Sequence, residues 1–175
     1  RLNTHLYIDG AIDSSTNLPQ VTLDELAQHS DGLICLTGGP DGPLGRFHAT
    51  GQHAKARALL ERLAAVYPNR LYVELQRHPG PGGALPETEA LAERGAIDLA
   101  YEMNLPIVAT NDVYFPKPEM YEAHDALICI AEGAYVDQQQ PRRRLTPQHY
   151  FKSEAEMAAL FADLPEALEN TVEIA

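Results

Sequence analysis

Cysteine and basic residues are both scarce in this sequence of 175 residues. The two cysteines, Cys35 and Cys129, lie far apart in apolar surroundings. We therefore expect buried free thiols in a reducing compartment rather than a disulfide framework. The 13 Lys and Arg residues are outnumbered by 25 Asp and Glu residues, which gives a formal net charge of −12. Such an acidic balance argues against a dedicated phosphate-binding module.

Long hydrophobic runs are absent as well, because every apolar stretch is far shorter than the roughly 20 residues of a transmembrane helix. No signal peptide is visible at the N-terminus, so we expect a cytoplasmic protein without membrane contact. Hydrophobic residues make up 45% of the chain and charged residues 22%, which is typical of a folded globular domain. The chain begins at Arg1 and ends within an apparent helix at Ala175, so we expect a fragment of a longer protein.

Common catalytic motifs are missing too: there is no HExxH, CxxC, GxSxG or P-loop pattern. The glycine-rich turn at 38–42 follows an apolar run, but it lacks the Lys-Ser/Thr partner of a phosphate-binding loop. Pro40 also removes one backbone N–H from any phosphate cradle there. The sequence therefore offers little support for a phosphate site.

The apolar pattern that is present alternates between the periods of strands and helices. Short apolar runs predict three buried strands, apolar on both faces, at 32–37, 71–75 and 105–110. Helical spacing predicts longer helices at 52–66, 86–103 and 119–131. This order predicts an α/β fold with a mostly parallel sheet and flanking helices.

Helix starts are marked by local capping patterns. Thr22 with Glu25, and Ser153 with Glu156, each predict a capping box at the start of a short helix. Pro165 predicts the first turn of a last helix. In the helix at 119–131, the side chains expected to face inward are Ala123, Leu127, Ile130 and Ala131.

Two residues at the predicted strand ends are candidates for chemistry, because active residues of parallel sheets gather at the carboxyl ends of the strands. Asp112 follows the third strand and can bind a metal or act as a base, or else cap a turn. His78 follows the second strand and is either a metal ligand near Asp112 or a solvated loop histidine. Both alternatives stay open for each residue.

Three further features are weaker candidates for a functional role. His48 and His53 are five residues apart, which does not align them on one helical face, so we expect both at the surface. His124 is expected to be a structural helix residue. The basic run Arg142, Arg143 and Arg144 predicts a contact with nucleic acid or an acidic partner, or else a solvated loop.

Several segments, in this order, resemble the alpha subunit of the bacterial replicative C-family DNA polymerases (DNA polymerase III). They are 32–39 (GLICLTGG), 71–78 (LYVELQRH), 105–113 (LPIVATNDV), 122–130 (EAHDALICI), 145–153 (LTPQHYFKS) and 161–167 (FADLPEA). The resemblance covers nearly the whole chain and lies in the later part of the PHP (polymerase and histidinol phosphatase) domain. It implies that 1–135 is the C-terminal portion of that domain and that 136–175 is a linker with helices leading toward the polymerase palm.

The resemblance also implies part of a distorted, TIM-like, seven-stranded β/α barrel, of which three strands are evident here. The Mg²⁺-dependent palm site of the parent polymerase lies outside this chain, so the family implies no catalytic residue and no cofactor within it. We therefore expect contact with DNA to occur through the parent protein.

Some relatives hold a metal cluster in this barrel, and two of their ligand motifs differ here. They have Asp-x-His where this sequence has Asp112-Val113-Tyr114, and Cys after Ser-Gly where it has Gly39. A phenol is a poor replacement for imidazole, and glycine has no side chain. The resemblance therefore implies that Asp112 is a vestigial metal ligand and His78 a weak one.

Relatives without the metals resemble a scaffold that docks the separate proofreading exonuclease subunit, among other subunits of the polymerase III holoenzyme. Docking is expected at loop 79–85 or at loop 133–144. The alternative is a metal-dependent PHP phosphoesterase or proofreading nuclease.

Overall fold

The computed structural model describes residues 21–138 and 145–175, in which helices and parallel strands alternate. The first elements are α2 (Leu23–Gln28), β1 (Cys35–Leu36), α3 (Pro43–Ala49), α4 (His53–Val66), β2 (Leu71–Gln76), α5 (Glu87–Glu102) and β3 (Ile107–Thr110). They are followed by the 3-10 turn η1 (Pro118–Met120), α6 (Tyr121–Glu132), α7 (Glu154–Leu160) and α8 (Pro165–Ile174). None of the helices in these ranges is long and apolar enough to cross a membrane.

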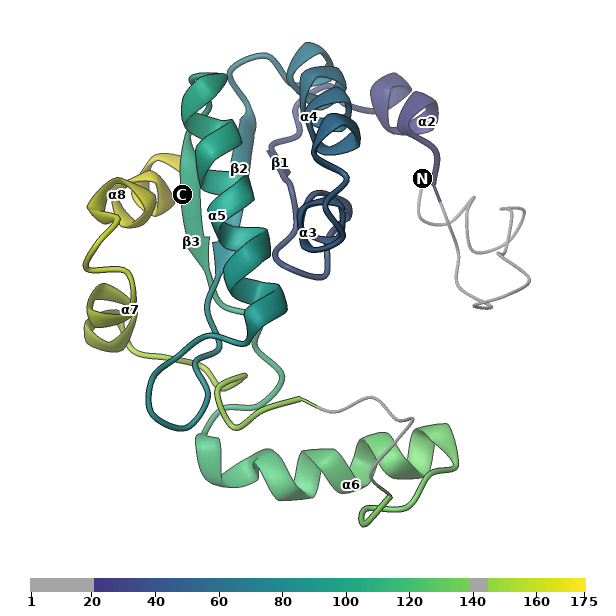
Figure 1. Cartoon of the computed structure of the whole chain (residues 1–175), viewed down its shortest axis with the longest axis vertical. Coiled ribbons are helices and arrows are strands. Elements are labelled where there is room, and N and C mark those ends of the chain that lie inside the picture. The colour runs from purple at the N-terminus through teal and green to yellow at the C-terminus, as the bar shows by residue number, and fades with distance from the viewer. Residues whose placement is uncertain (1–20, 139–144) are drawn as a thin grey trace.

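The three strands form one parallel sheet in the order β1-β2-β3. Cys35 is paired with Leu71, and Val73 with Ile107. Helices α3 and α4 connect β1 to β2, and α5 connects β2 to β3, as Figure 1 shows. The predicted α/β fold with a parallel sheet and flanking helices is confirmed, with three strands in the described part of the chain.

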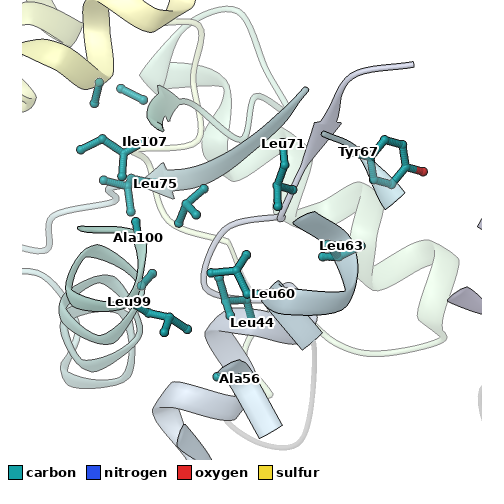
Figure 2. Packing of buried hydrophobic residues seen from close by; sticks show 14 of the residues in the cluster. Leu44, Ala56, Leu60, Leu63, Tyr67, Leu71, Leu75, Leu99, Ala100 and Ile107 are labelled. Carbon is teal, nitrogen blue, oxygen red and sulfur yellow. The ribbon is translucent and has the colours of Figure 1, made fainter. Parts of the chain in front are cut away.

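The hydrophobic core lies between the sheet and helices α3, α4 and α5. Figure 2 shows side chains of α4 and α5 meeting those of β2, among them Leu60, Leu99 and Leu75. Strand β2 alternates: Leu71, Val73 and Leu75 are buried, whereas the residues between them are half-buried. The prediction of strands that are apolar on both faces is therefore wrong for β2, which has one apolar and one mostly polar face.

The C-terminal helices belong to the same core. Phe161 and Ala167 are fully buried in the core cluster, and α8 packs against β3. The side-chain amide of Asn170 donates to the carbonyl of Ile107 over 2.8 Å. This contact covers part of the β3 edge, which would otherwise leave a backbone acceptor unpaired.

Both predicted capping boxes form. The Thr22 hydroxyl accepts from the N–H of Glu25, and the Ser153 hydroxyl accepts from the N–H of Glu156. In each case the glutamate accepts in return from the capping residue, so two helix-terminal donors are satisfied. Pro165 is the first residue of α8, as predicted. Cys35 and Cys129 are free thiols, and Cys129 is buried.

Strand β1 differs from the prediction in length and burial. It spans two residues rather than 32–37, and Leu33, Ile34 and Leu36 are exposed. Within the described residues β1 pairs with β2 alone, so this apolar run has no cover on its other side. An apolar run is buried only where a neighbour covers each of its faces.

Helix α6 turns the predicted face outward. Ala123, Leu127, Ile130 and Ala131 are all exposed, and the buried residues of α6 are Asp125 and Cys129. In Figure 1, α6 lies apart from the sheet at one end of the molecule. The predicted inward orientation of these four side chains is therefore wrong.

Candidate functional site at the carboxyl ends of the strands

A polar network around Glu74 joins the ends of the three strands. The Glu74 carboxylate accepts from the N–H of Gly38 (3.0 Å), the amide of Gln76 (3.1 Å) and the hydroxyl of Thr110 (2.5 Å). The N–H of Glu74 donates to the Thr37 hydroxyl (3.0 Å). This half-buried carboxylate is thus held by neutral donors from the backbone and from side chains of β2 and β3.

At Gly39, where the resemblance implies a cysteine in metal-binding relatives, Gln76 fills the adjacent space. A Cβ atom at Gly39 would lie 2.1 Å from Oε1 of Gln76 and 2.4 Å from its Cδ. A cysteine at this position would require the Gln76 side chain to move away from Glu74. The residues of β2 and those that follow β1 are therefore hydrogen-bonded to each other at the strand ends. They do not form a set of metal ligands.

His78 is buried at the end of β2, so its interpretation as a solvated loop histidine is wrong. Its Nδ1 lies 2.8 Å from Oε1 of Glu89, a buried residue of α5, and its backbone N–H donates to Oε2 of Glu89. Its Nε2 is buried without a hydrogen-bond partner. The sequence signal for this contact is weak, because Glu89 looks like any acidic residue in the first turn of a helix.

His149 covers one face of the His78 ring. The two rings are stacked, with centroids 3.9 Å apart and planes 3° apart. Burial and the nearby His78 lower the pKa of His149, while Asp112 and Glu89 act in the opposite direction. His78 lies two residues after the end of β2 and Asp112 two residues after the end of β3, so the parallel sheet brings the two predicted candidates to the same end.

Tyr114, where the resemblance implies a histidine in metal-binding relatives, packs among aromatic rings. It makes edge-on contacts with His124 (5.6 Å between centroids) and His149 (6.0 Å). Its backbone N–H donates to the carbonyl of His149. His124 also contacts Phe115, and its Nδ1 is buried without a partner, in keeping with a structural residue of α6.

The described residues do not fit the ligand set that the resemblance implies for metal-binding relatives. In residues 21–138 and 145–175, no group of three or more His, Cys, Asp or Glu side chains is placed to hold a metal ion. Gly39 has no donor atom, Tyr114 packs in an aromatic cluster, and Glu74 is bonded to neutral groups. The assignment of Asp112 as a vestigial ligand remains a prediction.

Arg77, which no sequence pattern singles out, is the most extensively bonded side chain at this edge. Nε and one terminal nitrogen donate to both oxygens of Glu93, and the terminal nitrogens donate to both oxygens of Asp163. A fifth bond reaches the carbonyl of Leu160, and the guanidinium lies 4.6 Å from the centre of the Phe161 ring. All five N–H donors of the guanidinium are therefore used.

These contacts raise the pKa of Arg77, chiefly through its hydrogen bonds to Asp163. In return, hydrogen bonding to Arg77 lowers the pKa of Asp163. Asp163 is 86 residues from Arg77 in the chain, so no local pattern signals the pair. The predicted contact residues Arg142, Arg143 and Arg144 lie outside the part of the chain that the structure describes.

Comparison with known proteins places these features in a family. Residues 1–78 match the PHP domain. The chain is 49% identical over 174 residues to the DNA polymerase III subunit alpha of Caulobacter vibrioides, covering 99% of this chain and 14% of that protein. It is 46% identical over 152 residues to the corresponding subunit of Pseudomonas aeruginosa, covering 87% of this chain and 12% of that one. The chain thus spans a small part of the relatives it matches.

Proposed function

This chain belongs to the DNA polymerase III alpha subunit family, and we propose that it is a PHP scaffold within a template-directed DNA polymerase. Residues 1–135 would form the C-terminal portion of the PHP domain, and 136–175 the segment leading to the palm. Nucleotide transfer and its Mg²⁺ would belong to the palm of the parent protein. The hydrogen-bonded strand ends around Glu74 support a scaffold, because neutral donors occupy the edge where metal-binding relatives have ligands.

The observation that carries the docking part of this proposal is an exposed apolar stripe on α6. It consists of Ala123, Leu127, Ile130 and Ala131, which recur at helical spacing. Leu127 is 62% exposed and Ile130 is 77% exposed. The exposed side chains of Tyr135 and Val136 follow in the chain. Large exposed apolar patches mark interaction surfaces, and we name the four residues on the helix together with Tyr135 and Val136 the α6 stripe.

The expected docking loop 133–144 begins directly after α6 and contributes Tyr135 and Val136 to this surface, whereas the other expected docking loop, 79–85, lacks such a surface. It is rich in glycine and proline, and a hydrogen bond between the N–H of Gly80 and the carbonyl of Ala84 closes it. No large hydrophobic side chain of this loop is exposed. We therefore propose that the proofreading exonuclease subunit, the partner that the family resemblance implies, docks on the α6 stripe.

The test is a binding titration between the exonuclease subunit and the full-length alpha subunit that contains this chain. The double variant Leu127→Ser/Ile130→Ser removes apolar surface at two exposed positions. We expect it to weaken binding by about tenfold or more, a loss typical of central interface residues. Val172→Ser on α8 is the matched control, because Val172 is as exposed as Ile130. It should bind like the unaltered protein.

Two results would overturn the proposal. Unchanged binding by the double variant would show that the exonuclease docks elsewhere. The absence of any complex between the exonuclease and the unaltered alpha subunit would refute the proposed docking role. A double variant whose free alpha subunit melts at a markedly lower temperature, while the control does not, would show that the stripe packs within the alpha subunit itself.

The alternative of a metal-dependent phosphoesterase is tested separately. Elemental analysis of the full-length alpha subunit after dialysis would detect zinc or manganese held in stoichiometric amounts. Retention that is lost when Asp112 is replaced by Asn would favour the phosphoesterase and contradict the metal-free scaffold that we propose.

A further inference from the structure

His48 and His53 meet at the corner between α3 and α4. His48, in the last turn of α3, is 6% exposed, so its predicted surface position is wrong, whereas His53, the first residue of α4, is exposed. Their Nδ1 atoms lie 3.2 Å apart and share a hydrogen bond. Gly95 of α5 makes room for the buried ring, because a Cβ there would lie 2.2 Å from Nδ1 of His48. The packing of α3 on α5 thus holds one imidazole nitrogen directly opposite another.

The separation of the two Nδ1 atoms matches that of two histidine ligands on one zinc ion. Zinc binds imidazole nitrogen at about 2.0–2.1 Å, so two nitrogens of a tetrahedral site lie about 3.3 Å apart. A metal ion lies to one side of the line that joins its two ligand atoms, so one ring must turn to bind it. The exposed ring of His53 can make this turn while α3 and α4 stay in place.

His48 is held in the protonation state that metals bind. Burial and the neighbouring His53 lower the pKa of His48, while Asp98 acts in the opposite direction. The neutral imidazole is the metal ligand, so no proton has to be displaced from a cationic His48 ring. With a metal on Nδ1, the ring carries its proton on Nε2, which is buried without a partner. This unsatisfied N–H costs affinity, so we expect weaker binding than at structural zinc sites.

A cleft of about 420 Å³ opens beside the pair and carries negative charge. Both histidines line it together with Arg57, Asp98 and Glu102. Arg57 forms an ion pair with Glu102, so Asp98 gives the cleft one negative charge beyond that pair. Asp98 lies one turn after Gly95 on the same face of α5. The cleft therefore gives a cation both access to the two rings and a favourable field.

The pair supplies two ligands of a site that stays open. In residues 21–138 and 145–175, no third His, Cys, Asp or Glu side chain is placed to complete the set. Water would fill the remaining positions around a bound ion, as it does at zinc sites with an open position. Imidazole suits zinc, copper and nickel, whereas magnesium and calcium prefer oxygen ligands.

We propose that His48 and His53 bind a divalent transition-metal ion such as Zn²⁺ through their Nδ1 atoms. The ion joins the end of α3 to the start of α4 and is reached through the cleft. This site uses none of the candidate residues at the strand ends, and it is independent of the proposed docking on α6.

The test is a calorimetric titration of the full chain, without a histidine tag, with ZnCl₂ at about pH 7.5. We expect one high-affinity ion per chain and a loss of affinity of about tenfold or more in His53→Asn, which removes one of the two ligands. His53 is exposed, so this variant leaves the core intact. MgCl₂ in place of ZnCl₂ should give no binding heat.

His29→Asn is the matched control, because His29 is an exposed histidine on the C-terminal cap of α2. It should bind zinc like the unaltered chain. Equal zinc affinity in the unaltered chain and in His53→Asn would overturn the proposal. An equal loss in His29→Asn would also overturn it, since zinc would then be binding to scattered surface histidines.

A second measurement identifies the ligand atoms. Nitrogen-15 spectra of the imidazole rings distinguish the two ring nitrogens and show which one binds a metal. On addition of one equivalent of ZnCl₂, we expect the Nδ1 resonances of His48 and His53 to shift together and those of His29 to stay in place. Unchanged resonances of His48, or a zinc-dependent shift at other histidines alone, would contradict the site.

Discussion

Arg77 and His78 are consecutive residues at the end of β2, both are buried, and they are bonded in opposite ways. Arg77 uses all five of its donors on groups from α5, from the last residue of α7 and from the segment between α7 and α8. His78 uses one ring nitrogen on Glu89 and leaves the other without a partner. One strand end thus combines a fully satisfied structural contact with a ring that retains an unused polar atom.

The difference follows from which elements each side chain meets. Arg77 lies between three elements that are far apart in sequence, so its bonds hold the C-terminal helices to the sheet. His78 meets a single carboxylate and the flat face of His149. The stack on His149 covers a face of the His78 ring and supplies no hydrogen-bond partner at its edge, so Nε2 stays unpaired. Three sets of variants test this contrast.

The largest effect is expected for Arg77→Met. The variant leaves Glu93, whose side chain is 14% exposed, without its bidentate partner. Removing one member of a buried ion pair typically costs about 3–5 kcal/mol of unfolding free energy. Urea denaturation of the chain measures this loss. The matched control is Arg57→Met, whose partner Glu102 is exposed and which should cost about 1 kcal/mol or less. Equal losses would show that the Arg77 contacts are no stronger than a surface pair.

A smaller effect is expected for His78→Phe. The aromatic ring keeps the stack on His149, but buried Glu89 loses its imidazole donor, at a cost of about 1.5–3 kcal/mol. His149→Phe keeps the stack and leaves the His78–Glu89 bond intact, but it removes the half-buried hydrogen bond from the N–H of Thr146, so its cost should be about 0.5–1.5 kcal/mol. Urea denaturation of both variants gives the comparison. A larger loss for His149→Phe would place the stabilisation in the stack rather than in the carboxylate bond.

The smallest effect concerns Asp163, the more exposed partner of Arg77. Its pKa is lowered in the folded chain by hydrogen bonding to Arg77, so this stabilisation is present above the ordinary Asp value of 3.8. It is lost as the pH falls through the lowered pKa of the folded state. Because Asp163 is exposed, the loss should be about 1 kcal/mol or less.

Asp163→Asn should remove this pH dependence, which unfolding free energies at about pH 5 and about pH 2.5 would reveal by comparison with the unaltered chain. An unchanged dependence in Asp163→Asn would place the acid sensitivity in other carboxylates.

Local patterns were enough to predict the order of strands and helices, both capping boxes and the parallel sheet. Thr22 with Glu25 and Ser153 with Glu156 specify their helix starts through contacts three residues apart. The alternation of apolar residues along β2 matches the alternation of its buried positions, although its polar face was not predicted. These features depend on neighbours in the chain and are therefore visible in the sequence.

Features that depend on distant partners were not predictable. The apolar face of α6 was identified from Leu127 and Ile130, but spacing does not reveal whether any element covers that face. The burial of His48 depends on the missing side chain of Gly95 on another helix. At the candidate site, His78 and Asp112 were placed at the correct edge because strand order determines that edge. The stack with His149 and the contacts of Arg77 required the fold itself.

The burial of Phe161 and Ala167 in the core has a consequence for the order of events during synthesis. Strands β2 and β3 are synthesised before these two residues exist, so their apolar faces cannot be fully covered at that time. Translation from Thr110 to Ala167 takes roughly 3 to 11 s at elongation rates of about 5–20 residues per second. During this interval the nascent chain presents an incomplete core, which is the kind of surface that chaperones bind.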